Sequence, residues 1–278
     1  MKQYLDQLQY ILDHGTRKKD RTGVGTISCF GLQARYRMAD GFPAVTTKRL
    51  VWRSLVTELL WFISGSDNIY DLKSLYPNNR LWDGNYQDYL KRTGQPESDG
   101  SMGRIYGAQW RHWRGVDRTV DQLQEAIHTI KTNSDSRRIM VNAWNAAEVG
   151  LRDVALPPCH NFFQFYVAEN RLSLQMYQRS CDMFLGVPLN IASYSLLLHM
   201  VAQLTHLEPY EFIHTLGDVH IYLNHINAVR EQLSRTPYPL SRLHIEGRGQ
   251  KTIDDFVYGD FKLIDYKHHP AIKAEMAV

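Results

Sequence analysis

The 278-residue sequence predicts an α+β fold, in which a mixed or antiparallel sheet packs against helices within a single domain spanning residues 1–278. Hydrophobic residues make up 44% and charged residues 22%, so the composition is that of a globular chain with a sizeable core. Helix and strand patterns are interleaved, but they lack the strict strand–helix–strand repetition of a parallel sheet. No internal repeat and no long linker divides the chain.

The first half of the chain contains several helix patterns and one clear strand pattern. Residues 1–15 carry apolar side chains at helical spacing and end in Gly15, which predicts an amphipathic helix. Residues 32–38 alternate apolar with polar side chains, as a half-buried strand does. Residues 52–64 predict a strongly apolar helix closed by a glycine. Residues 77–104 are rich in Asn, Gly, Asp and Ser, which indicates a surface excursion around a short helix.

The second half of the chain is expected to supply most of the sheet. Apolar positions between residues 120 and 130 predict another amphipathic helix. Strands are expected over residues 138–144, 160–167 and 171–179, the last two joined by a polar turn. A long buried helix is expected over residues 190–207, and a second helix over residues 218–235.

Charge and cysteine content exclude several classes of protein. The net charge is +3, from 32 Lys and Arg against 29 Asp and Glu, which is too mild for a polybasic nucleic-acid or membrane surface. Cys29, Cys159 and Cys181 are too few for a disulfide framework and lack zinc spacing, so we expect no metal and a reducing, cytoplasmic location. The start of the chain has no apolar signal core, and residues 191–204 include polar side chains, so we expect no membrane span.

Two polar side chains stand in apolar or rigid surroundings. Glu58 lies among the apolar residues of 55–62, so it is either a general base or proton relay in a cleft, or a side chain on a helix face that reaches solvent. The Pro157-Pro158 pair pre-sets the backbone before Cys159. Cys159 is therefore either a nucleophile presented to a cleft or a small buried apolar residue.

Several basic side chains are candidate anion ligands. Arg21 lies in a polar loop, Arg137 and Arg138 are adjacent, and Arg179-Ser180 ends an alternating strand. Four arginines in one site would form a pocket for a dianion, because the guanidinium fork matches phosphate, whereas each arginine alone could be ordinary solvated charge.

His220 and Tyr222 alternate with apolar neighbours, so they could share one face and donate to hydroxyl groups, or His220 could be structural. From these residues alone we expect an enzyme with a cysteine nucleophile, a buried carboxylate and a phosphate site lined by arginine. They do not specify the electrophile.

Six motifs, in order and nearly from end to end, resemble the thymidylate synthase family. They are Asp20-Arg21-Thr22-Gly23, Gly41-Phe42-Pro43-Ala44-Val45-Thr46-Thr47-Lys48, Glu58-Leu59-Leu60-Trp61-Phe62, Pro157-Pro158-Cys159-His160, Gln178-Arg179-Ser180-Cys181-Asp182 and Asn190-Ile191-Ala192-Ser193-Tyr194, with a matching terminal Ala277-Val278. The resemblance implies a two-fold symmetric α+β homodimer. It also implies reductive methylation of dUMP to dTMP, with 5,10-methylenetetrahydrofolate as co-substrate and dihydrofolate as product.

The resemblance also implies catalytic roles. Cys159 would add as a thiolate to C6 of the uracil ring, which makes C5 nucleophilic. Glu58 would organise a proton relay near O4, and Tyr106 would support activation of the cysteine. Asn190 would pair with the uracil edge, and Trp82 would cover the folate side of the intermediate.

Further contacts are implied in the same way. The implied substrate contacts are Arg21, Arg179 and Ser180 for the phosphate, Arg137 and Arg138 reaching into the site of the partner subunit, and His220 and Tyr222 for the ribose 3′-hydroxyl. The implied folate contacts are Asp182 for the pterin, Trp82, Leu156, Met276 and Ala277 for packing, and Lys48 for the tail. Each active site would therefore need both chains of the homodimer, and no nucleic-acid partner is required.

Three residues depart from the common family pattern: Asn85 stands for a second Trp, Leu189 for a Phe and Leu216 for a Gly. The nearest alternative function is that of a dUMP 5-hydroxymethyltransferase of the same superfamily, in which water replaces the hydride. A cysteine hydrolase would need a Cys–His pair and an oxyanion hole. A nucleic-acid-binding protein is disfavoured by the small net charge.

Overall fold

The computed structural model describes residues 1–20 and 22–275, and one mixed sheet forms its frame. In this described part the main sheet has six strands in the order β1-β2-β8-β7-β6-β5. Their bounds are β1 (Thr16–Lys18), β2 (Thr26–Arg37), β5 (Met140–Asn142), β6 (His160–Ala168), β7 (Arg171–Asp182) and β8 (Glu208–Tyr222). Neighbouring strands are antiparallel except β7 and β8, which are parallel, so the sheet is mixed as the sequence predicts. Two small antiparallel two-stranded sheets pair β3 (Trp113–Arg114) with β4 (Thr119–Val120) and β9 (Arg242–Ile245) with β10 (Phe261–Ile264).

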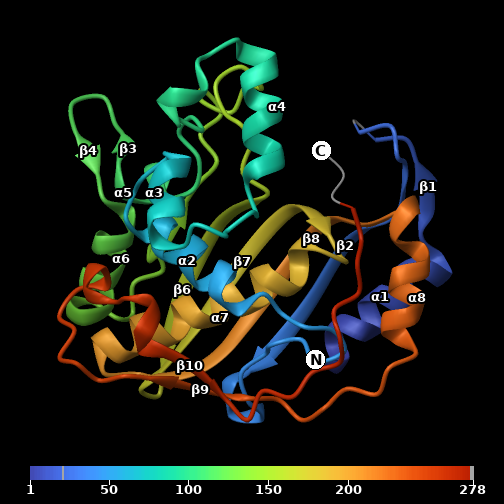
Figure 1. Ribbon diagram of the computed structural model, residues 1–278. Coiled ribbons are helices and arrows are strands. Elements are labelled where there is room, and N and C mark those ends of the chain that lie inside the picture. Colours follow the sequence, from blue (N-terminus) through green and yellow to red (C-terminus); the bar gives the residue numbers. More distant parts are fainter. Residues whose placement is uncertain (21, 276–278) are drawn as a thin grey trace.

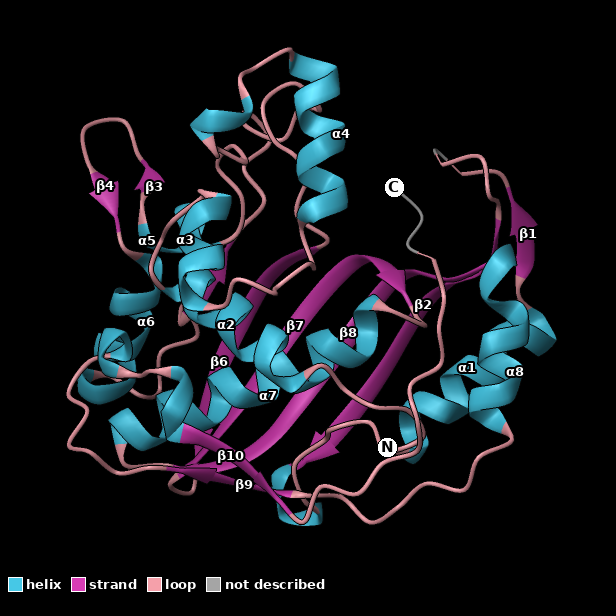
Figure 2. Ribbon diagram, in the orientation of Figure 1, coloured by secondary structure: helices cyan, strands magenta, loops and turns pink. Residues whose placement is uncertain are grey.

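Helices pack against one face of this sheet. The described helices are α1 (Lys2–His14), α2 (Trp52–Ile63), α3 (Ile69–Leu75), α4 (Asp83–Thr93), α5 (Gly107–Arg111), α6 (Gln122–Thr132), α7 (Gly186–Thr205) and α8 (Ile226–Leu233). Helices α2 and α7 lie across the front of the sheet in Figure 2. Helix α7 is apolar on all sides because it lies between the sheet and other helices. It is also long and apolar enough to cross a membrane, but 78% of its apolar window is buried inside the molecule.

Local sequence explains several boundaries. The β6–β7 hairpin turns at Glu169 and Asn170, whose φ values of 51° and 59° match the right-handed twist of the strands. Helix α1 ends at Gly15, whose φ of −71° is ordinary. A Cβ there would lie 2.5 Å from the carbonyl oxygen of Ile11, so close approach requires the glycine.

The expected helix over residues 218–235 is wrong in its first part and confirmed in its second. Residues 218–222 complete the long strand β8, and helix α8 begins only at Ile226. Strand β8 has neighbours on both edges and polar side chains that are paired inside the core, so its sequence lacks a simple apolar–polar alternation. The alternation of His220 and Tyr222 with apolar residues was the correct signal for a strand.

Smaller differences concern element lengths. Strand β2 starts earlier than predicted, β5 covers only part of residues 138–144, and Val120 lies in β4 before helix α6. Residues 77–104 contain the short helix α4 as expected, but they are not simply a surface excursion. Trp82, Tyr86 and Tyr89 are buried in the core, which fixes α4 against the rest of the molecule.

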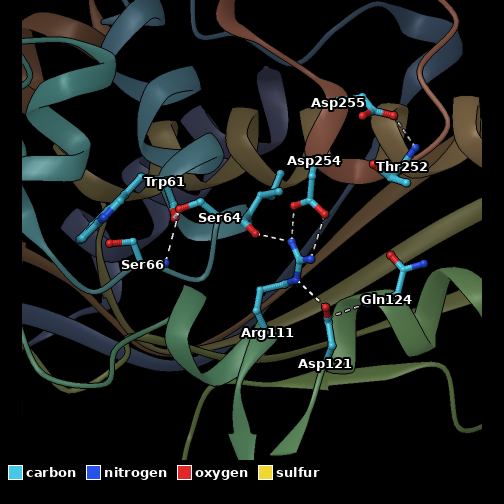
Figure 3. Close-up of polar contacts among 10 residues, drawn as sticks. Trp61, Ser64, Ser66, Arg111, Asp121, Gln124, Thr252, Asp254 and Asp255 are labelled. Atoms are coloured by element: carbon cyan, nitrogen blue, oxygen red, sulfur yellow. Dashed lines mark hydrogen bonds and ion pairs between the residues drawn. The ribbon is translucent and has the colours of Figure 1, made fainter.

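Arg111 of α5 joins three separate segments (Figure 3). Its Nε donates to Asp121, which caps the start of α6, at 2.8 Å. Its two terminal nitrogens donate to the carboxylate of Asp254 at 2.6 and 3.0 Å, and one of them also donates to the carbonyl of Ile63 at the end of α2. This arrangement ties the end of α2, helix α5 and the start of α6 to the segment around Asp254.

Candidate active site

A cavity of about 1170 Å³ lies where the parallel strands β7 and β8 both end. In Figure 1 helix α4 and strand β1 stand on opposite sides of the C-terminal segment at this end of the sheet, and residues of all three line the cavity. The predicted site residues that line it are Lys48, Glu58, Trp82, Tyr106, Leu156, Cys159, Arg179, Ser180, Asp182, Asn190, His220 and Tyr222. Arg137 and Arg138 are exposed and do not line it. Arg21, Met276 and Ala277 lie outside the described residues.

Cys159 is presented by a loop that Arg179 holds in place. The guanidinium Nε and Nη2 of Arg179 donate to the carbonyls of Pro158 and Pro157 at 2.9 and 2.8 Å. Burial raises the pKa of the Cys159 thiol, and the positive charge of Arg179 opposes that effect. The cysteine therefore faces the cavity, next to a cation that favours its thiolate.

Tyr106 contacts the same cysteine from the opposite wall. Its hydroxyl accepts a 2.7 Å hydrogen bond from the backbone N–H of Cys159. Its φ of 32° lies in the left-handed region, which is strained for a tyrosine by roughly 1–3 kcal/mol. The next residue, Gly107, packs so closely on Phe62 that a Cβ would lie 2.2 Å from the Phe62 carbonyl oxygen. Close packing of α5 on α2 therefore imposes the conformation that directs Tyr106 toward the cysteine.

Glu58 points into the cavity, so the proton-relay interpretation is favoured over a solvent-facing helix position. Burial raises its pKa to about 7, although the Trp82 indole Nε1 donates to its Oε1 at 2.7 Å and lowers the pKa. A carboxyl group with that pKa exchanges protons readily near neutral pH.

His160 also lines the cavity, although it was not among the predicted site residues. Strand β6 starts at His160 and is irregular between His160 and Phe162, so the simple alternation of faces along a strand does not hold there. The His160 ring stacks on Tyr106 with centroids 4.0 Å apart, and its Nδ1 lies 2.6 Å from the Tyr194 hydroxyl. Burial lowers the pKa of His160 to about 3, so the ring is neutral. The sequence signal that could have indicated His160 is its position directly after Cys159.

Asp218 organises the polar end of the cavity, although it was not among the predicted site residues. His220 Nδ1 lies 3.3 Å from Asp218 Oδ1, and Lys18 Nζ donates to Oδ2 at 2.6 Å. The hydrogen bond from His220, followed by that from Lys18, holds the pKa of Asp218 well below its usual range. Asp20 accepts from the backbone N–H groups of Thr22 and Gly25 at 3.0 and 2.6 Å, which shapes the neighbouring loop.

Lys48 and two of the departures from the family pattern also line the cavity. Lys48 donates to the carbonyl of Phe184, which lies two residues before α7, and burial lowers the pKa of Lys48 to about 8 while Asp182 opposes the change. Of the three departures from the family pattern, Asn85 and Leu189 line the cavity, whereas Leu216 is buried in the core and does not.

The C-terminal segment lies along one side of the cavity. Ala271, Ile272 and Ala274 contribute to its lining. The Nε2 of buried His225 lies 2.6 Å from the carbonyl oxygen of Glu275, which fixes the last described residue.

Known proteins of one family are similar to this chain over nearly its whole length. A model of the thymidylate synthase family matches residues 2–278. Thymidylate synthase from Homo sapiens is 52% identical over 287 residues, covering 99% of this chain and 90% of the human protein. Thymidylate synthase from Mycoplasma mobile is 52% identical over 298 residues, covering the whole of both chains. Because the family model and both relatives match nearly the whole chain, the chain belongs to the thymidylate synthase family.

Proposed function

We propose that this chain is a methyltransferase that converts dUMP to dTMP by reductive methylation, with 5,10-methylenetetrahydrofolate as co-substrate and dihydrofolate as product. The observation that carries this proposal is Cys159, held by Arg179 and Tyr106 in a cavity that also contains Glu58 and Asn190. A nucleophile, a proton-exchanging carboxyl group and an amide for the base are the groups that the reaction requires. The whole-chain similarity to thymidylate synthases supports the same conclusion.

Cys159 forms the covalent bond to the nucleotide. Its thiol must lose a proton before Sγ adds to C6 of the uracil, and burial alone disfavours that loss. Arg179 lies close enough to lower the pKa of the thiol, and binding of the nucleotide phosphate at Arg179 and Ser180 would bring C6 to the cysteine. Addition at C6 makes C5 nucleophilic.

Glu58 and Tyr106 manage protons around the ring. With a pKa of about 7, Glu58 can both give and receive a proton near O4 through ordered water. Burial raises the pKa of Tyr106 well above its usual range, so it stays neutral and acts as a hydrogen-bonding group beside Cys159. His220 and Tyr222 lie at the polar end, where the ribose 3′-hydroxyl would bind.

The cavity fits a folate beside the nucleotide. Its volume of about 1170 Å³ exceeds that of a pocket for one drug-sized ligand, roughly 300–1000 Å³. Trp82, Leu156 and Leu189 provide an apolar wall, and Asp182 and Lys48 provide charge on that side. The folate supplies the one-carbon unit and the hydride. The residues of this chain hold it and exclude water, and Met276 and Ala277 are proposed as further folate contacts from the family resemblance.

The functional unit is proposed to be a symmetric homodimer of single-domain chains in the cytoplasm. The exposed position of Arg137 and Arg138, outside the cavity of their own chain, supports a role in the site of a partner subunit. Phe162 and Tyr166 of β6 are 37% and 65% exposed, which supports an intersubunit contact on that face of the sheet.

One assay separates the proposed reaction from hydroxymethyl transfer. The purified chain is mixed with dUMP and 5,10-methylenetetrahydrofolate, and both nucleotides and folates are separated by chromatography. We expect dTMP and dihydrofolate in equal amounts. A main product of 5-hydroxymethyl-dUMP without dihydrofolate would show instead that water, and not hydride, reaches the intermediate.

A further inference from the structure

His214 is a buried side chain on β8 that connects the core with the base-binding end of the cavity. It is 0% exposed, and its Nε2 lies 2.9 Å from Oε1 of Gln178 on the neighbouring strand β7. These two strands lie side by side in Figure 1. Gln178 Nε2 in turn donates to Oδ1 of Asn190 at 3.1 Å and to the carbonyl oxygen of Ser180 at 3.0 Å. The three side chains form a continuous chain of hydrogen bonds.

The position of the proton on the His214 ring decides which group donates in each of these hydrogen bonds. Burial lowers the pKa of His214 to about 3, so the ring is neutral and carries one proton. Among the described residues, its buried Nδ1 has no hydrogen-bond partner. A proton on Nδ1 would be an unpaired buried donor, whereas a proton on Nε2 is accepted by Gln178. His214 therefore donates from Nε2, and Gln178 directs its oxygen toward His214 and its nitrogen toward Asn190.

The donor and acceptor roles in these hydrogen bonds determine which pyrimidine Asn190 can pair with. Its Oδ1 accepts from Gln178 and keeps a second lone pair, and its Nδ2 remains a donor. Uracil offers an N3–H donor beside the O4 acceptor, which suits an amide in this orientation. Cytosine offers an N3 acceptor beside an amino donor, so it requires the reversed amide.

The hydrogen bonds of Gln178 and His214 oppose reversal of the Asn190 amide. A reversed Asn190 would place its Nδ2 against Nε2 of Gln178, and both are donors. Gln178 cannot turn over without placing its own nitrogen against the donor of His214 and its oxygen against the Ser180 carbonyl. Facing donors leave buried groups unpaired, which costs more than a lost hydrogen bond.

We propose that His214 is a positioning residue for pyrimidine specificity, which holds Gln178 and Asn190 in the orientation that accepts uracil and rejects cytosine. This inference rests on the proposed function, because it takes the uracil of dUMP as the partner of Asn190. His214 does not line the cavity and acts only through Gln178. Ser180 provides a second anchor for Gln178, so the effect of losing His214 is smaller than that of changing Asn190 itself.

The test compares three variants by their relative affinity for dUMP and dCMP, measured calorimetrically. His214→Phe removes both ring nitrogens and keeps a ring beside Phe212, whereas His214→Gln keeps a donor. His199→Phe is the matched control, because His199 is another core histidine with an unpaired buried Nε2 but is not in this chain of hydrogen bonds. We expect His214→Phe to lower the preference for dUMP about tenfold, the effect of one hydrogen bond, and the other two variants to stay within about twofold.

An unchanged preference in His214→Phe would overturn the proposal, and so would an equal shift in His199→Phe, which would indicate a general loosening of the core. Nitrogen-15 NMR of the wild-type protein gives a measurement that needs no variant: the His214 proton is expected on Nε2, and a proton on Nδ1 would overturn the proposal. Affinity for nucleotides is measured without folate. Failure of the proposed methyl transfer would therefore appear in the product assay and not in this ratio.

Discussion

The indole Nε1 of Trp82 donates a 2.7 Å hydrogen bond to Oε1 of Glu58, and this contact joins the proposed folate wall to the proposed proton relay. Trp82 is 5% exposed and also packs edge-on against Trp61 and Phe62. The carboxyl group is therefore held by a rigid donor, and its protonation is set by burial rather than by a neighbouring cation.

Glu58→Gln should make the folded protein less sensitive to pH. The folded-state pKa of Glu58 is about 7 and its ordinary value is 4.5, so the folded state binds more protons between these values. The free energy of unfolding of the wild type should fall as pH rises through that window, by up to roughly 3 kcal/mol. The Gln variant keeps the bond from Trp82 and has no such loss.

Urea unfolding at about pH 5 and about pH 8 measures this effect, and the advantage of the variant should grow with pH. An equal difference at both pH values would contradict the buried, proton-exchanging Glu58. Turnover of the variant should be strongly reduced at every pH, because an amide cannot relay a proton.

Cys159→Ala should abolish dTMP formation and leave dUMP affinity nearly unchanged. The reason is that the proposed base and phosphate contacts belong to other residues that line the cavity. Cys29→Ala is the control, because Cys29 is a half-buried cysteine on β2 outside the cavity. Measurable dTMP from purified Cys159→Ala would exclude this cysteine as the nucleophile.

Asn190→Asp should shift the substrate preference from dUMP toward dCMP. A protonated or water-linked carboxyl group suits the N3 acceptor and amino group of cytosine, and mismatched buried polar groups can change selectivity by several kcal/mol. Relative kcat/KM for the two nucleotides measures the shift. Asn85→Asp, at another amide that lines the cavity, should leave the preference unchanged. Equal kcat/KM ratios in wild type and Asn190→Asp would refute the pairing.

Arg138→Ala and Cys159→Ala proteins should each be nearly inactive and should regain activity when their subunits are exchanged. One site of the mixed dimer would combine an intact Cys159 with an intact Arg138 from the partner, up to about a quarter of full activity for random pairing. Glu58→Gln mixed with Cys159→Ala is the control, because both residues line the same cavity and should not complement. No recovery despite exchange confirmed by mass spectrometry would place Arg138 outside the partner's site.

Arg111→Met should destabilise the fold by about 2–3 kcal/mol, because it leaves two carboxylates and a carbonyl without their shared donor. The Arg111 side chain is 12% exposed. Arg114→Met, at a position that is 64% exposed and whose side chain pairs with Glu148, should cost less than about 0.5 kcal/mol. Urea unfolding of both variants checks the difference, and equal losses would contradict a special role for Arg111.

Local sequence determined the elements whose signals are short-range. Helix α2 follows directly from its apolar run, and the β6–β7 hairpin follows from two alternating segments around Glu169 and Asn170. The sequence also indicated Cys159 and Glu58 as candidate site residues. Such patterns can be read along the chain because each depends on neighbours a few positions away.

Only the tertiary structure decided which distant residues meet at the site and how they hydrogen-bond. Strand β8 and the chain from His214 through Gln178 to Asn190 depend on partners far away in sequence, as does the contact of Tyr106 with Cys159 across 53 positions. A polar residue whose partner lies on another element looks like any other polar residue in a sequence. Its burial, its pKa and the direction of its hydrogen bond are set only when packing removes water and brings that partner into reach.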